Sequence, residues 1–120
     1  MCINFKRLAA SFKFSLSGLR DILKEENSFK LELVIAAIVT AATFYFNLSP
    51  LEKAAIFIVI FFVLFAELIN SVVERIMNVY NPNFDYRIKK IKDICSAIVL
   101  LSCLMAAIVG IIIFADKLPF

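Results

Sequence analysis

Two glutamates at one end of a long apolar segment are the residues of this chain best placed to do chemistry. Glu67 and Glu74 lie within and just beyond the apolar run from 54 to 73. An ionisable side chain at membrane depth costs roughly 2.5 kcal/mol or more, so it is a functional-site hypothesis by default. On a helix with about 100° per residue, Asn70 and Asn78 share a narrow arc with both glutamates. This polar stripe must face protein, water or a metal ion rather than lipid.

Further polar residues stand at the same end of the other apolar segments. Glu26 and Glu32 lie before and at the start of the first segment, and Lys92, Asp93 and Ser96 lie at the start of the third. Because membrane topology brings these positions to one level, we expect a single site. Mg²⁺ commonly takes one or two carboxylates together with substrate phosphates. The residues therefore indicate phosphoryl transfer, which needs positioning, charge neutralisation and a base for the attacking hydroxyl.

Some of these residues also fit roles outside catalysis. Asn70 and Ser71 alone could equally be polar contacts between membrane helices. Lys92 and Asp93 alone could be an exposed helix start, with Asp93 favourable to the helix dipole. A small transporter or channel that relays ions through the two stripe glutamates is a second functional class. A transport site is expected near the bilayer midplane, whereas no carboxylate lies deeper in any apolar segment.

The composition requires membrane helices to position these residues. The chain has 120 residues, is 62% hydrophobic with a mean hydropathy of +0.92 and holds only two glycines, which excludes an ordinary soluble domain. About 20 apolar residues cross a bilayer, so residues 31–48, 54–73 and 94–114 are three expected spans. The shortest span needs snorkelling of Lys30 and Lys53 at its ends. We predict one all-α membrane domain over residues 1–120.

The segments outside the spans have simple predicted roles. Residues 5–26 carry apolar side chains three or four apart, which predicts an amphipathic helix on the membrane surface. A short polar break at residues 25–28 should follow it, and tight turns are expected at 47–50 and 81–83, before a basic stretch at 86–92. Neither glycine begins a phosphate-binding loop. The absence of histidine leaves carboxylates, lysine and a hard cation for any catalysis.

The cysteines and the cations carry different information. Cys2, Cys95 and Cys103 have no paired spacing and are interpreted as small apolar residues. Only Lys53 and Lys117 lie between the first two spans or after the third, while the other eleven of the thirteen lysines and arginines precede the first span or follow the second. The positive-inside rule then places the N-terminus in the cytoplasm and the C-terminus outside. Lipid or nucleotide phosphate fits these cations better than nucleic acid does.

One stretch carries a resemblance to a known family. Glu67-Leu68-Ile69-Asn70-Ser71-Val72-Val73-Glu74 is similar to the Glu-x-x-Asn-[ST]-x-x-Glu signature of the prokaryotic diacylglycerol kinases, the small three-span bacterial lipid kinases that include undecaprenol kinases. Lys92-Asp93-x-x-Ser96 follows some eighteen residues later. Phe5-Lys6-Arg7, Gly18-Leu19-Arg20 and Glu26-Asn27-Ser28-Phe29 with Glu32 also match the family's register. The resemblance covers nearly the full length.

The resemblance implies a role for each matching residue. Glu67 would be the general base, while Glu26 and Glu74 would hold Mg²⁺ on ATP. Nucleotide contacts would come from Arg7, Phe14, Glu26, Glu74, Lys92 and Asp93. Lipid contacts would come from Arg7, Ser28, Phe29, Lys30, Leu31, Glu32, Glu67, Asn70 and Ser96. Phe14 stands where many members have an aromatic hydroxyl, and Asn78 stands where they have an acid.

The resemblance also implies an assembly and an activity. It implies a homotrimer in the bacterial inner membrane, with active sites shared between neighbouring chains at the cytoplasmic interface. The expected reaction is ATP-dependent phosphorylation of a membrane hydroxyl, with diacylglycerol as the preferred acceptor. Undecaprenol is the alternative acceptor, because lipid tails are read by apolar side chains that have little chemical identity.

Overall fold

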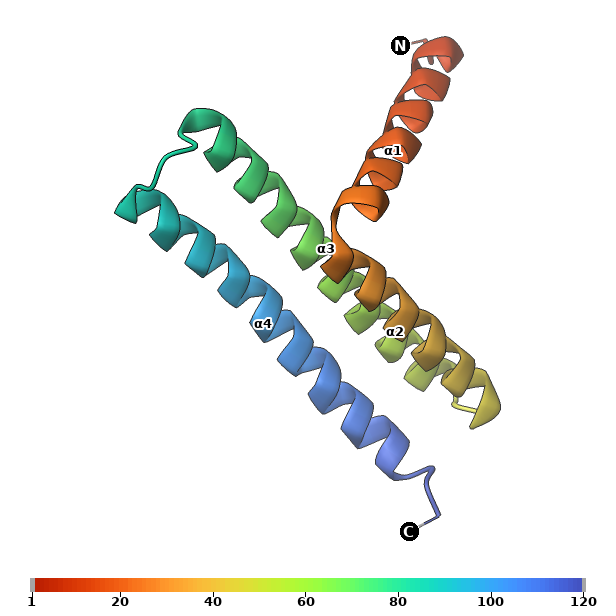
Figure 1. Cartoon of the computed structure of the whole chain (residues 1–120). Helices are drawn as coiled ribbons and strands as arrows, with labels where there is room; N and C mark the ends of the chain where they lie inside the picture. Colours follow the sequence, from red (N-terminus) through yellow and green to blue (C-terminus); the bar gives the residue numbers. More distant parts are fainter. Residues whose placement is uncertain (1, 120) are drawn as a thin grey trace.

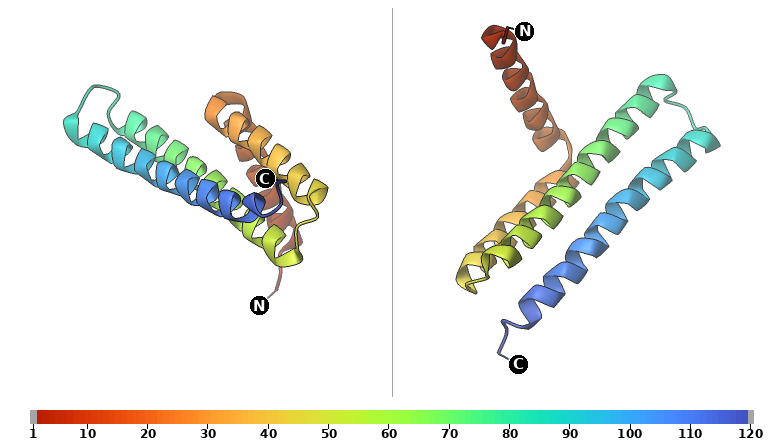
Figure 2. Two further views of the ribbon diagram at one scale, coloured as in Figure 1. Left: turned by 90° about the horizontal axis from the view of Figure 1, so that it is seen from below. Right: turned by 180° about the vertical axis from the view of Figure 1, so that it is seen from behind.

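Four helices form nearly the whole structure. A computed structural model describes residues 2–119 and contains α1 (Phe5–Glu25), α2 (Asn27–Tyr45), α3 (Pro50–Tyr80) and α4 (Tyr86–Ala115), with no strand in that range. The central α3 packs against both α2 and α4, and each runs antiparallel to it (Figures 1 and 2). Helices α2, α3 and α4 are each long and apolar enough to cross a membrane. The predicted all-α class with three spans is confirmed.

Helix α1 is amphipathic and has no buried residue. It leaves the bundle at an angle, so its N-terminal half lies away from the other helices (Figure 1). The apolar side chains of Phe5, Phe12 and Leu16 are exposed on it. A helix of this kind, whose apolar face no protein covers, belongs at the membrane interface. The predicted amphipathic helix is therefore confirmed, and its place on the membrane surface stays a prediction.

The break between α1 and α2 is narrower than the sequence suggested. Glu26 alone leaves the helical conformation, with φ of −110° and ψ of 107°. Asn27 and Ser28 already belong to α2, although a polar break over residues 25–28 was expected. One extended residue is enough to redirect the chain from α1 into the bundle.

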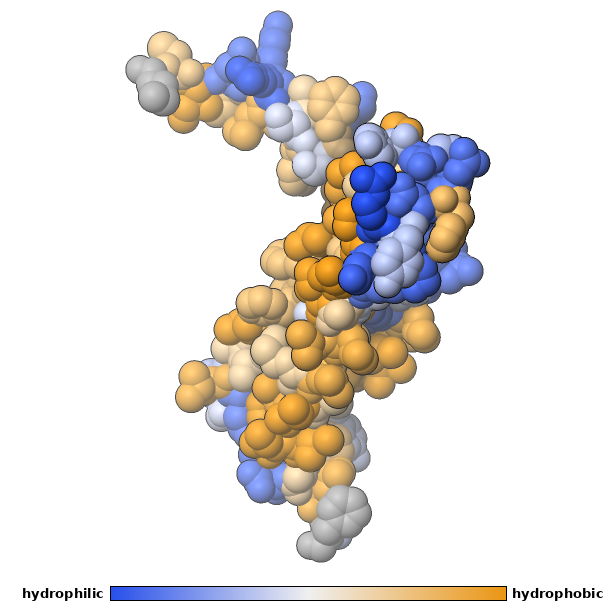
Figure 3. Space-filling model, turned by 90° about the vertical axis from the view of Figure 1, so that its left-hand side faces the viewer, coloured by the Kyte–Doolittle hydropathy of each residue, from blue (hydrophilic) through white to orange (hydrophobic). Residues whose placement is uncertain are grey.

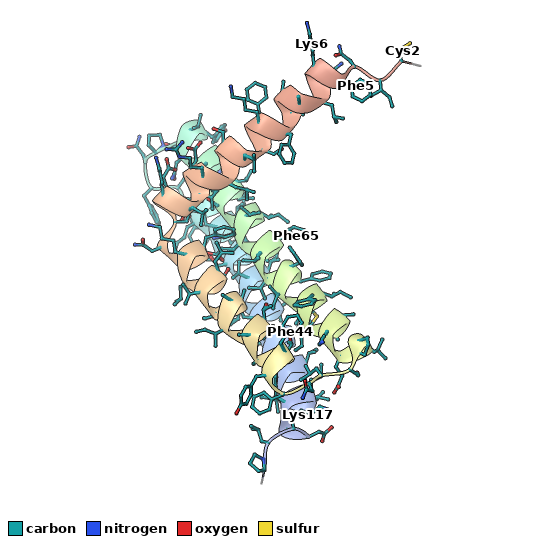
Figure 4. The ribbon with its side chains drawn as sticks, turned by 90° about the vertical axis from the view of Figure 1, so that its right-hand side faces the viewer. Cys2, Phe5, Lys6, Phe44, Phe65 and Lys117 are labelled. Atoms are coloured by element: carbon teal, nitrogen blue, oxygen red, sulfur yellow. The ribbon has the colours of Figure 1, made fainter. Side chains whose placement is uncertain are left out.

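A tight turn and a small core define the bundle end opposite α1. Asn47 takes a positive φ of 50°, which asparagine tolerates in turns. The Ser49 Oγ accepts from the Glu52 backbone N–H at 3.2 Å, and a Glu52 carboxylate oxygen accepts from the Ser49 N–H at 2.9 Å. This capping box starts α3, as the predicted turn requires. Leu48, Ile56 and Ile113 form the buried cluster beneath it, and Phe44 and Lys117 lie at the same end (Figure 4).

Two helices continue beyond their expected spans. Helix α3 runs on to Tyr80 and α4 begins at Tyr86, although the apolar runs cover only 54–73 and 94–114. Hydropathy marks only the part of a helix that suits lipid. The charged residues that follow this part do not end the helix. Asp85 caps α4 by accepting from the Arg87 backbone N–H at 2.9 Å. Hydrogen bonds from the Arg87 side chain and backbone hold the pKa of Asp85 below its ordinary value.

Apolar side chains cover the outside of the bundle. Figure 3 shows them over its middle, while hydrophilic residues gather at the end that carries the α3–α4 connection. Within one chain only 11%, 22% and 6% of the most apolar windows of α2, α3 and α4 are buried. The rest of each window must face lipid or other protein, as expected for a membrane protein with several spans.

Candidate functional site

Glu26 reaches from the α1–α2 junction to α3. As the first residue before α2, it makes no side-chain cap to that helix. Its Oε1 instead accepts a hydrogen bond from the Ser71 hydroxyl at 3.0 Å. Ser71 is buried, with 4% of its surface exposed. The bond joins α3 to the junction between α1 and α2 and fixes Glu26 beside α3. A contact of Ser71 between membrane helices stays a prediction.

Arg75 completes the contacts around Glu26. Its Nη2 lies 3.6 Å from the Glu26 Oε1 and also pairs with Glu25, and its Nε donates to the Ser71 Oγ at 3.3 Å. Sequence reasoning counted Arg75 only as one of the cations that follow the second span, and Glu25 only as part of the polar break at residues 25–28. The signal for their pairing was weak, because nothing in the sequence shows that a residue at the end of α1 lies beside α3. The pair ties the surface helix to the bundle.

Glu67 lies among the other carboxylates of this end. It is half-buried on α3, near the carboxyl groups of Glu26, Glu74 and Glu32. One carboxylate oxygen of Glu32 is buried without a hydrogen-bond partner among residues 2–119. The structure therefore brings together the four glutamates that the sequence placed at one membrane level.

A small cavity opens between α3 and α4 on the polar stripe. It measures about 80 Å³ and is lined by Asn70, Val73, Glu74, Lys92 and Ser96. The sequence predicted that the polar residues of the second and third spans converge, and this is confirmed. The cavity presents one carboxylate, one ammonium group, an amide and a hydroxyl, which together suit a phosphate group and its cation.

Lys92 and Asp93, just before the expected third span, make contacts that the sequence did not predict. Lys92 donates to the Asn78 Oδ1 at 2.8 Å, which joins the far end of the polar stripe to α4. Asp93 pairs instead with Lys89 at 2.7 Å, one turn away along the same helix. The suggestion that Asp93 begins the helix is wrong, because α4 starts seven residues earlier and Asp85 is its cap.

Other candidate residues lie outside the cluster of one chain. Arg7 and Phe14 are exposed on α1, and α1 points away from the bundle (Figure 2). Of the predicted lipid contacts on α2, Phe29 is buried at 4% exposure, whereas Leu31 is 61% exposed. Ser28 and Lys30 are also exposed. A single chain thus brings the four glutamates together, but it does not gather all of the predicted nucleotide and lipid contacts around them.

The oxygen donors fit a metal that also binds substrate. Among residues 2–119 no group of three or more acidic or cysteine side chains is arranged to hold a metal ion. Glu26 and Glu74 still offer hard oxygen ligands near Glu67. Mg²⁺ commonly binds through one or two carboxylates and completes its shell with phosphate and water. The donor set therefore fits Mg²⁺ whose remaining ligands are water or phosphate.

An apolar groove leads away from the carboxylate cluster. It measures about 710 Å³ and runs between α2, α3 and α4, with Glu32 and Cys103 among its lining residues and Leu118 near its other end. Cys103 is half-buried and free. The groove is in the size range of small-molecule sites. An apolar groove that has a carboxylate on its wall suits a molecule with a polar head and a long tail.

Comparison with known proteins gives the family. The family described as prokaryotic diacylglycerol kinase matches residues 13–114. A diacylglycerol kinase of Haemophilus influenzae is 30% identical over 89% of this chain and 92% of that protein. A diacylglycerol kinase of Helicobacter pylori strain J99 is 28% identical over 92% of this chain and 80% of its own. An undecaprenol kinase of Bacillus subtilis is 26% identical over 93% and 91%. The chain belongs to the prokaryotic diacylglycerol kinase family.

Proposed function

We propose that this protein transfers the γ-phosphate of ATP to the free hydroxyl of diacylglycerol, which yields phosphatidic acid. The observation that carries the proposal is the cluster of Glu26, Glu32, Glu67 and Glu74 beside an apolar groove. Carboxylates supply the base and the metal ligands of such a reaction, and the groove suits a lipid tail. The relatives named above are kinases, which favours phosphate transfer over ion transport.

Each part of the transfer has a proposed residue. Glu67 accepts the proton of the lipid hydroxyl, whose oxygen then bonds to the γ-phosphorus while the bond to ADP breaks. Glu26 and Glu74 would hold Mg²⁺, which supplies charge neutralisation on the phosphates when bound. Lys92 and Asp93 would contact the nucleotide. Glu32, Asn70 and Ser96 would shape the lipid and phosphate sites.

The size of the cavity and the position of α1 support a site shared between chains. The cavity beside Glu74 measures about 80 Å³, whereas sites for small organic ligands span about 300–1,000 Å³. A nucleotide therefore needs further walls. Arg7 and Phe14 lie on a helix that points away from its own cluster, so they could serve a neighbouring copy. We propose that these sites lie between chains of the homotrimer that the family resemblance implies.

The acceptor is tested by direct competition. Diacylglycerol and undecaprenol are offered together in mixed micelles to the purified protein with labelled ATP, and the two products are separated. We expect most of the label in phosphatidic acid. Predominant labelling of undecaprenyl phosphate would assign the alternative acceptor, which the Bacillus subtilis relative supports.

The proposed orientation places the site on the cytoplasmic side, where ATP is found. Eleven of the thirteen cations favour it. In a variant without native cysteines, a cysteine at the exposed position 49 should react with an impermeant reagent from outside. A cysteine at the exposed position 83 should react only after the membrane is opened. The reverse pattern would place the carboxylates away from ATP.

A further inference from the structure

The contacts of Glu26 form a closed ring that includes a cation. The Ser71 hydroxyl and the Arg75 guanidinium share the same oxygen, Oε1, at 3.0 and 3.6 Å. Arg75 also donates to Ser71 and pairs with Glu25. One guanidinium therefore lies between two carboxylates, one at the end of α1 and one at the junction. The ring places a permanent positive charge beside a carboxylate that is proposed to bind a metal.

This charge must affect cation binding at Glu26. Arginine stays protonated in proteins, so it cannot be neutralised when a metal arrives. The side chains of Arg75, Glu26 and Glu25 are 44%, 32% and 55% exposed, so the guanidinium has room to turn between its partners. A position nearer Glu26 would repel a divalent cation, and a position nearer Glu25 would release the carboxylate. The two partners compete for one cation.

We propose that Arg75 is a built-in counter-ion of Glu26 that weakens divalent-cation binding there, and that Glu25 restrains it by drawing the guanidinium aside. The inference rests on the proposed assignment of Glu26 as a metal ligand. It makes Arg75 and Glu25 positioning residues that set how much Mg²⁺ the site needs. They touch neither substrate nor the reacting atoms.

Opposite effects of two substitutions follow from this arrangement. Arg75→Gln removes the competing charge and should tighten cation binding roughly three- to tenfold, a range typical of one charge in a partly screened setting. Glu25→Gln leaves the guanidinium to Glu26 alone and should weaken binding roughly two- to fivefold. If the Arg75–Glu25 ion pair had a purely structural role, both substitutions would change cation affinity in the same direction, because each breaks that pair.

The measurement uses Mn²⁺ alone as the probe. The full-length protein in phosphatidylcholine nanodiscs, without nucleotide, is titrated with Mn²⁺, and the free ion is followed by electron paramagnetic resonance. Binding is thereby read without turnover. Arg75→Lys keeps the charge and should stay close to wild type. Circular dichroism and gel filtration confirm that each variant is folded and assembled.

Two control variants test whether any change of surface charge alters Mn²⁺ affinity in the same way as the loss of Arg75. Arg87→Gln removes a guanidinium that pairs with Asp85 instead, and Asp116→Asn removes a carboxylate that follows α4 at the opposite end of the bundle. Each should change Mn²⁺ affinity less than about twofold. In the double variant of Glu25 and Arg75, the Glu25 substitution should lose most of its effect, because its restrained partner is gone.

Two outcomes would overturn the inference in different ways. If Arg75→Gln and Glu25→Gln shift Mn²⁺ affinity in the same direction, or if Arg75→Gln does no more than Arg87→Gln, Arg75 is not a counter-ion. Glu26→Gln tests the underlying assignment separately. If it leaves Mn²⁺ binding unchanged, the metal role of Glu26 fails, and the inference fails with it.

Discussion

Replacement of Glu67 by glutamine is expected to reduce phosphate transfer to lipid by at least about 100-fold, the scale on which loss of a general base acts. Glutamine keeps the size and the hydrogen bonds but cannot accept the proton. Glu67 lies seven residues before Glu74 on α3, which places it roughly 10 Å deeper at about 1.5 Å per residue. The deeper carboxylate is better placed for a lipid hydroxyl. Transfer of labelled phosphate measures the rate, and a fluorescent ATP analogue measures binding, which should stay largely intact.

Glu52→Gln is the matched control for this prediction. Glu52 is a glutamate of the same helix, but it lies at the opposite end of α3, where it caps the helix and pairs with Lys117 at 3.3 Å. Glutamine can keep the capping bond to the Ser49 backbone, so this variant should fold and leave the transfer rate near wild type. A folded Glu67→Gln protein that binds nucleotide and phosphorylates lipid at the wild-type rate would make Glu67 a structural residue.

Replacement of Glu74 by glutamine is expected to change the metal requirement. Glu74 lines the cavity with Lys92 and Ser96. Loss of one charged ligand costs about 1.5–3 kcal/mol, so the Mg²⁺ concentration for half-maximal rate should rise about 10- to 100-fold. The rate is measured against Mg²⁺ at fixed ATP, with Glu52→Gln again as the control. Unchanged Mg²⁺ dependence in Glu74→Gln would remove Glu74 from the metal site.

The sequence predicted the helices better than their ends. Apolar runs near the length of a bilayer and an amphipathic N-terminal segment were sufficient for four helices, because both patterns reflect the solvent around each helix. The same reasoning placed the start of the third span at residue 94, but the helix begins at Tyr86. Charged residues end a span without ending a helix. The first span was expected to reach residue 48, but α2 ends at Tyr45, because the chain begins to turn at residue 46.

The candidate site was predictable in part for a similar reason. Glu67, Asn70 and Glu74 follow helical spacing, so their common face could be derived from the chain alone. The partners of Glu26 could not, because they depend on how α1 meets α3. Ser71 and Arg75 are four residues apart on α3, and only the folded junction shows that both contact the same carboxylate.

Phosphate transfer to lipid is the most direct test of the account. Purified wild-type protein in mixed micelles with diacylglycerol, Mg²⁺ and γ-labelled ATP is assayed for label that extracts into organic solvent. The account predicts labelled phosphatidic acid, formed only when protein, Mg²⁺ and lipid are all present. Folded protein that labels neither diacylglycerol nor undecaprenol would contradict the assignment of this carboxylate cluster to a lipid kinase.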